Sequence, residues 1–182
     1  MSFNTFAVAN QILKFASEEG RQITPMQIQK MLYFIHGWHL AEFKRPLIDD
    51  TFKAWRHGPI IRKIYREFRP FGDTPITRYA QTPGYIAPVF LQDIDGNGEC
   101  TNFVEEFFDL YKEFHPFTLS TESHKSGGPW STVRTKYWEK TGTIPDDLPI
   151  PNELIRSYFE KEILRIKHEY GTSEESLVTS QP

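Results

Sequence analysis

Two histidines are spaced as metal ligands often are. His36 and His39 stand three residues apart in a segment whose apolar spacing predicts a helix, so both imidazoles could hold one ion. No Glu follows His36 in the metalloprotease pattern, and the chain's one cysteine cannot form a ligand cluster. Two partly buried histidines beside Trp38 are the more ordinary interpretation. We therefore expect no bound metal, and a metal-dependent enzyme is the least favoured function.

An Asp- and Asn-rich segment resembles the start of a calcium loop. Asp93, Asp95 and Asn97 occupy the first, third and fifth positions of an EF-hand pattern. The twelfth position is Val104, and the required glutamate comes one residue late, at Glu105. We interpret the segment as a turn, without calcium.

Nucleophilic side chains lie outside recognisable catalytic patterns. Cys100 has no neighbouring base in the sequence, and Ser120, Ser123 and Ser131 do not form a nucleophile elbow. The sequence also contains no glycine-rich phosphate loop. A serine, a histidine and an aspartate could still converge in space. We nevertheless assign no catalytic residue and no cofactor, and expect a protein that is not an enzyme.

Cations recur along one stretch of the chain. Arg62, Arg66 and Arg69 follow one another at intervals of four and three, which places them on one helix face, with Lys63 beside them. Like charges repel on such a face unless acidic groups neutralise them, so a solvated face and a contact surface are equally supported. The net charge is −3, so we do not expect a nucleic acid partner.

Helix start signals are the clearest structural features of the sequence. Asn4 can cap a helix that runs to about residue 19, and Thr24, Pro25 and Gln27 form a capping box before a largely buried helix at 25–43. Further helices are expected at 60–71, beginning after Gly58-Pro59, at 102–115, at 118–124, at 130–138 and at 152–170. Short strands are expected at 52–55 and 86–91.

These elements predict a mainly α protein, a single compact multi-helix domain over residues 1–171 with a minor β element. Gly171 is expected to end the last helix, and residues 172–182 form a polar, disordered tail. A chain of 182 residues with 15% aromatic side chains can bury a sizeable core. No segment is long and apolar enough to cross a membrane, no signal peptide is visible, and we expect a cytoplasmic protein.

Several blocks of sequence, taken together, resemble a known family. They are 8–13 (VANQIL), 23–34 (ITPMQIQKMLYF), His36-Gly37-Trp38, 52–60 (FKAWRHGPI), and later Leu119-Ser120, His124, Pro129-Trp130 and 155–159 (IRSYF). Their order and spacing resemble the Panacea domain, the SocA-like or GepA-like antitoxin domain, over residues 7–159. The family-motif residues of this chain are His36, Trp38, Gly58, Pro59 and His124.

The resemblance implies a helical domain of bacteria, prophages and phages that neutralises a cognate protein toxin by direct binding, as in type II-like toxin–antitoxin systems. It also implies alternatives: an adaptor that delivers the toxin to a AAA+ protease, or a phage-encoded defence or counter-defence protein. The oligomeric state stays open. For Gly58-Pro59 we favour a structural role, because a helical domain needs tight turns.

The chemistry of the side chains suggests which residues would contact a partner. Arginine and tryptophan supply large anchors with hydrogen-bonding capacity. The candidate partner-binding residues are Trp55, Arg56, Arg62, Arg66, Arg69 and Trp130.

Overall fold

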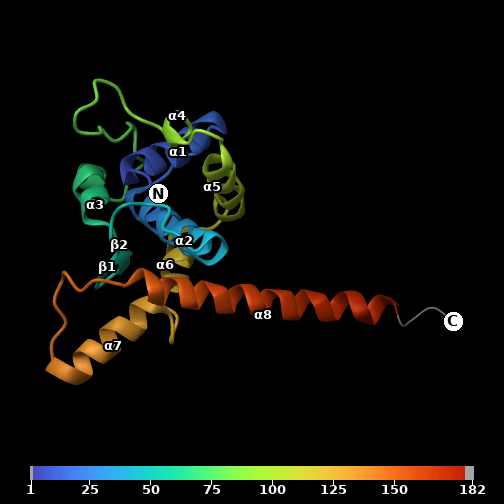
Figure 1. The fold of residues 1–182 in the computed structure, drawn as a ribbon. Helices are drawn as coiled ribbons and strands as arrows, with labels where there is room; N and C mark the ends of the chain where they lie inside the picture. The colour runs from blue at the N-terminus through green and yellow to red at the C-terminus, as the bar shows by residue number, and fades with distance from the viewer. Residues whose placement is uncertain (1, 179–182) are drawn as a thin grey trace.

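Helices dominate the computed structural model, which describes residues 2–178 (Figure 1). Its helices are α1 (Thr5–Glu18), α2 (Pro25–Phe43), α3 (Arg62–Phe68), the 3-10 turn η1 (Arg69–Phe71), α4 (Leu91–Ile94), α5 (Glu99–Tyr111), α6 (Pro116–Ser123), α7 (Pro129–Thr141) and α8 (Asn152–Val178). The two described strands, β1 (Lys53–Trp55) and β2 (Gly58–Ile60), form one antiparallel hairpin. The prediction of a mainly α fold with a minor β element is confirmed.

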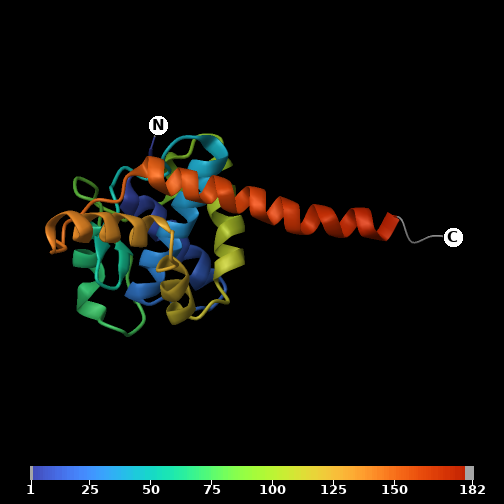
Figure 2. The same cartoon turned by 90° about the horizontal axis from the view of Figure 1, so that it is seen from below.

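Helix α2 forms the centre of the fold. The predicted capping box starts it: the Thr24 hydroxyl accepts the Gln27 N–H at 3.3 Å, and the Gln27 side chain accepts the Thr24 N–H at 3.2 Å. Its buried residues occur on every side, and α1, α5, α6 and α8 pack around it (Figures 1 and 2). The sequence correctly predicted that this helix is largely buried.

A glycine allows α8 to pack closely on α2. A Cβ at Gly37 would lie 2.2 Å from the Phe159 ring, so only glycine fits at this crossing. Around it, Phe159 packs edge-to-face with Tyr33, Phe34 and Trp38, with ring centroids 6.0, 6.2 and 4.9 Å apart. These contacts position the first half of α8 on the core.

The hairpin replaces part of a predicted helix. We expected Gly58-Pro59 to open a helix at residue 60, but residues 58–60 pair with 53–55 as strand β2, and α3 begins at Arg62. The segment before α8 extends this pairing, because Ala54 N–H donates to Leu148 O and Ile150 N–H donates to Phe52 O, both at 2.8 Å.

The strand predicted at 86–91 is wrong. Residues 75–90 form an irregular segment over α1, followed by the short helix α4. Asn10, which is fully buried on α1, organises this segment: its side chain accepts the Ala80 N–H at 2.7 Å and donates to the carbonyls of Ala80 and Val89 at 2.9 and 3.0 Å. A buried amide thus satisfies backbone groups that a strand would have paired.

Helix α5 begins before the predicted cap Asn102. The Asp95 carboxylate accepts the Thr101 N–H at 2.7 Å, and the Asn97 side chain accepts the Glu99 N–H at 3.2 Å. Asp95 and Asn97, which mimic calcium-loop positions, therefore lie at a turn that caps a helix; the sequence predicted the turn but placed the cap at Asn102.

Helix α8 extends well beyond the helical body (Figures 1 and 2). It continues through Gly171, where the sequence predicted its end, to Val178. Residues 179–182 of the predicted tail lie outside the described residues, so the division of the chain at residue 171 stays a prediction. No helix in the described part of the chain is long and apolar enough to span a membrane.

Candidate partner-binding surface

A buried lysine holds the turn of the hairpin. Lys30 on α2 is 2% exposed, and its ammonium donates to the carbonyl oxygens of His57 at 2.8 Å and Pro59 at 3.4 Å. Burial lowers the pKa of Lys30 to about 7. The two carbonyls partly replace the water that the ammonium loses, and in return the hairpin is fixed to the central helix.

Gly58 leaves the space that this lysine occupies. Its φ is +101°, and a Cβ there would lie 2.2 Å from Lys30 Nζ, 2.9 Å from Ser123 Oγ and 3.0 Å from His124 Cε1. Only glycine tolerates both the conformation and the close approach. Two predicted motif residues, Gly58 and His124, therefore meet, together with Pro59, around a lysine.

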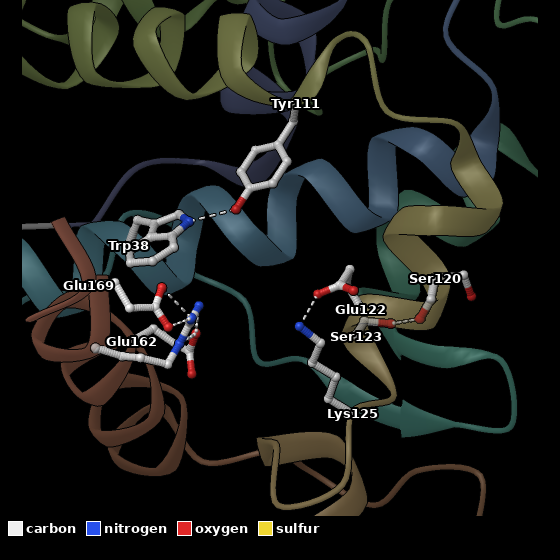
Figure 3. Close-up of polar contacts among 9 residues, drawn as sticks. Trp38, Tyr111, Ser120, Glu122, Ser123, Lys125, Glu162 and Glu169 are labelled. Carbon is white, nitrogen blue, oxygen red and sulfur yellow. Dashed lines mark hydrogen bonds and ion pairs between the residues drawn. The ribbon is translucent and has the colours of Figure 1, made fainter. Parts of the chain in front are cut away.

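Trp130 supports the hairpin from α7. Its indole N–H donates to Trp55 O at 2.7 Å, and its ring meets that of His124 edge-to-face, with centroids 4.2 Å apart. His124 Nδ1 lies 2.6 Å from Ser120 O. The same oxygen accepts the Ser123 hydroxyl at 2.7 Å (Figure 3). These contacts give Trp130 and His124 a structural role, and a direct partner contact by Trp130 stays a prediction.

The side chain of Trp55 forms an aromatic centre on the outer side of the hairpin. It is half-buried, and the Tyr65 ring packs against it edge-to-face, with centroids 4.8 Å apart. The Arg62 guanidinium lies 6.0 Å from the Trp55 ring and bonds to Asp147, with Nε 3.2 Å from Oδ1. Trp55 and Arg62, predicted as partner contacts, are thus brought together.

Unpaired cations lie on the same hairpin and on the helical segment that contains Arg62. Arg56 is at the hairpin turn, and Arg66 and Arg69 follow Arg62 on the same helical face. All three are exposed, and no described acidic side chain lies within ion-pair distance of them. We name the resulting patch the basic-aromatic surface; it comprises Trp55, Arg56, Arg62, Tyr65, Arg66 and Arg69.

The two histidines of α2 have separate partners. His36 Nε2 is 3.1 Å from the Asn152 side-chain oxygen, whereas His39 Nδ1 is 2.9 Å from Arg45 O. Burial lowers the pKa of each histidine to about 4, so both imidazoles are neutral at pH 7. Among the described residues, no three His, Cys, Asp or Glu side chains are grouped to hold a metal ion.

Cys100 is buried beside His39. Its sulfur lies 3.7 Å from His39 Nε2, and burial raises the pKa of the thiol. A thiol with a raised pKa is a poor nucleophile, so this pair serves packing.

Trp38 lies between α2, α5 and α8. Its indole N–H donates to the Tyr111 hydroxyl at 2.7 Å (Figure 3). Its ring stacks on Phe107 with centroids 5.8 Å apart. Burial raises the pKa of Tyr111 to about 12, so the oxygen that accepts the indole bond belongs to a neutral hydroxyl. The role of Trp38 therefore differs from that of Gly58, because Trp38 holds three helices together.

Sequence reasoning missed Lys30, Tyr65 and Asp147. Lys30 could have been found, because it lies among the buried positions of a capped helix. A buried ammonium needs acceptors, and these must come from another segment. Tyr65 and Asp147 carry no comparable signal, since only the tertiary fold brings them to Trp55 and Arg62.

Comparisons with known proteins identify the family to which the chain belongs. Residues 28–131 match the family described as antitoxin SocA-like, Panacea domain. The chain is 30% identical over 139 residues to a protein named Antitoxin SocA from Caulobacter vibrioides (strain NA1000 / CB15N), covering 72% of this chain and 71% of that relative. No solved structure matches the chain. The family match includes Lys30, Gly58 and His124, the residues that converge behind the hairpin.

Proposed function

Because this chain belongs to the antitoxin SocA-like Panacea family, we propose that it neutralises a cognate protein toxin by binding it directly, as the antitoxin of a type II-like toxin–antitoxin system. The observation that carries the direct-binding proposal is the basic-aromatic surface. Three exposed, unpaired guanidiniums lie on the hairpin turn and on the helical segment that follows Arg62, and the hairpin that carries Trp55 is fixed to the core by Lys30 and Trp130.

The chemistry of this surface suits an acidic site on the toxin. Arginine can bind a carboxylate through two parallel hydrogen bonds, and tryptophan buries a large area when it docks. Because the hairpin is already held in place, little conformational entropy is lost when it binds. A toxin active site lined with carboxylates, or shaped for a charged substrate, would be covered by such a surface.

Co-expression with each adjacent open reading frame tests the proposal. We expect one neighbour to stop growth alone, to become harmless when this chain is co-expressed, and to co-elute with it. If no neighbour is toxic, or if rescue occurs without a complex, neutralisation by direct binding is wrong for this protein.

Charge reversal tests the basic-aromatic surface itself. We expect the double variant Arg66→Glu/Arg69→Glu to lose rescue and co-elution while its thermal unfolding stays close to that of the wild type. A matched control is Lys136→Glu/Lys140→Glu, which reverses two exposed cations on α7, outside this surface. Equal loss in both variants would show that net charge, rather than this surface, governs binding.

A further inference from the structure

A second surface of different chemistry lies on the other side of α2. In Figures 1 and 2, α3 and the hairpin lie on one side of α2, and α5 lies on the other. There, residues of α2, α5 and α8 line an open groove of about 700 Å³. Its lining comprises Trp38, Glu42, Phe43, Glu99, Asn102, Phe103, Glu106, Phe107, Leu110, Ile163, Ile166 and Lys167.

The groove is apolar and its floor is fixed. Trp38 is held by its hydrogen bond to Tyr111. Phe107 stacks on Trp38 and packs at a tilt against Phe103, with centroids 5.8 and 4.6 Å apart. At the edges, Leu110 is 53% exposed and Ile166 is 36% exposed. Large exposed apolar side chains around a preformed hollow are typical of a binding groove.

The charged side chains of the groove are mainly acidic. Glu42 and Glu106 are exposed, and no described cation lies within ion-pair distance of either carboxylate. Glu99 bonds to Arg45, with oxygen and nitrogen 3.3 Å apart, and Lys167 is the one cation among the lining residues. An occupant with cations beside an apolar stripe would therefore supply partners that the Glu42 and Glu106 carboxylates lack among the described residues.

We propose that this groove receives a basic amphipathic helix of the bound toxin. The inference rests on the proposed function for the identity of the partner, whereas the chemistry of the helix follows from the groove. An apolar helix face would cover Trp38, Phe107 and Leu110, and flanking lysines or arginines would pair with Glu42 and Glu106. The toxin would then contact two surfaces of opposite charge, and this difference in charge would fix its orientation on the chain.

Two synthetic peptides test the groove without the toxin. Each has about 18 residues, with leucine at the i, i+3, i+4 and i+7 positions of one face; lysine fills the other positions in the first peptide and glutamate in the second. Backbone amide shifts of the full chain are followed during titration. We expect the lysine peptide to shift residues of α2, α5 and α8, and to bind at least about tenfold more tightly than the glutamate peptide.

Variants distinguish binding in the groove from general electrostatic attraction between the peptide and the chain. We expect Glu42→Lys/Glu106→Lys and, independently, Leu110→Arg to weaken binding of the lysine peptide at least about tenfold. The matched control Glu105→Lys/Glu139→Lys reverses two exposed carboxylates that lie outside the groove, and should change the affinity less than roughly twofold.

Three outcomes would overturn the proposal: equal binding of both peptides, shifts centred on the hairpin and α3, or equal loss in the groove and control variants. A wild-type dimer that Leu110→Arg converts to a monomer would also overturn it, because a second copy would then occupy the groove. Since no toxin is used, these outcomes are independent of whether the chain is an antitoxin.

Discussion

At the scale of single residues, Gly58 and Lys30 decide where the hairpin lies. A side chain at residue 58 and the ammonium of Lys30 would compete for one position, because the Cβ would be 2.2 Å from Nζ. Displacing the ammonium would leave the carbonyls of His57 and Pro59 without their donor. The cost would combine backbone strain with lost hydrogen bonds in a buried place.

We therefore expect Gly58→Ala to lower the free energy of unfolding by about 3 kcal/mol, measured by urea denaturation. The control is Gly142→Ala at the end of α7, where φ is +69° and nothing would meet the added Cβ. It should cost about 1 kcal/mol, the strain of the left-handed conformation alone. Equal losses in the two variants would contradict the clash with Lys30.

The lowered pKa of His36 leads us to expect that the protein loses stability in acid. Burial lowers its pKa to about 4, against an ordinary value of 6.5, so the unfolded chain binds more protons between these values. Stability should therefore fall as the pH drops from 6.5 to 4, with this histidine contributing about 1.4 kcal/mol per pH unit. With Nε2–H directed at Asn152, a proton on Nδ1 would have no acceptor among the described residues.

The measurement is the free energy of unfolding at several pH values. The His36→Phe variant should take up one proton fewer than the wild type when it unfolds in that pH range. Leu32→Ala, which removes a fully buried side chain without a titrating group, should be less stable and retain the wild-type slope. An unchanged slope in His36→Phe would show that His36 does not resist protonation.

At the scale of elements, the sequence contains two capping boxes, and only one of them starts a helix. The Thr24 box starts α2, whereas Asn102 lies inside α5 because Asp95 and Asn97 already satisfy the first turn. We expect Thr24→Ala to cost about 1 kcal/mol in thermal or urea unfolding. Asn102→Ala should cost nothing measurable, since alanine favours a helix interior. A loss of similar size at Asn102 would contradict the start of α5.

Local signals predicted the long helices, and tertiary contacts account for the errors. Residues 58–60 became a strand because they pair with β1 and accept bonds from Lys30, neither of which is visible in local spacing. The irregular segment at 75–90 is positioned by Asn10, about 70 residues earlier in the chain. Such long-range polar contacts override the weak preferences of short segments.

The candidate site was predictable in part. The resemblance to a family singled out Gly58, Pro59 and His124, and the structure shows that they meet. Arg62 and Trp55 were chosen by chemistry, and the fold places them beside each other. The groove between α2, α5 and α8 could not be predicted, because its lining comes from three segments whose crossing angles the sequence does not encode locally.

At the scale of the whole molecule, the fold presents a basic-aromatic surface on one side of α2 and an acidic, apolar groove on the other. The net charge of −3 conceals this separation. A partner that complements both surfaces would be oriented by their opposite charges before close contacts form. Under the proposed function, recognition of a toxin would depend on the arrangement of charge rather than on its sum.

The most direct test of the central claim uses two purified proteins. The toxic product of the adjacent gene is assayed for its own activity while this chain is added in increasing amounts, with no protease or nucleotide present. Direct neutralisation predicts that activity falls in proportion to the added chain and reaches zero at a fixed stoichiometry. Full toxin activity in the presence of a saturating amount of this chain would contradict direct neutralisation. If the toxin is then lost in cells only when an ATP-dependent protease is present, the chain acts as an adaptor.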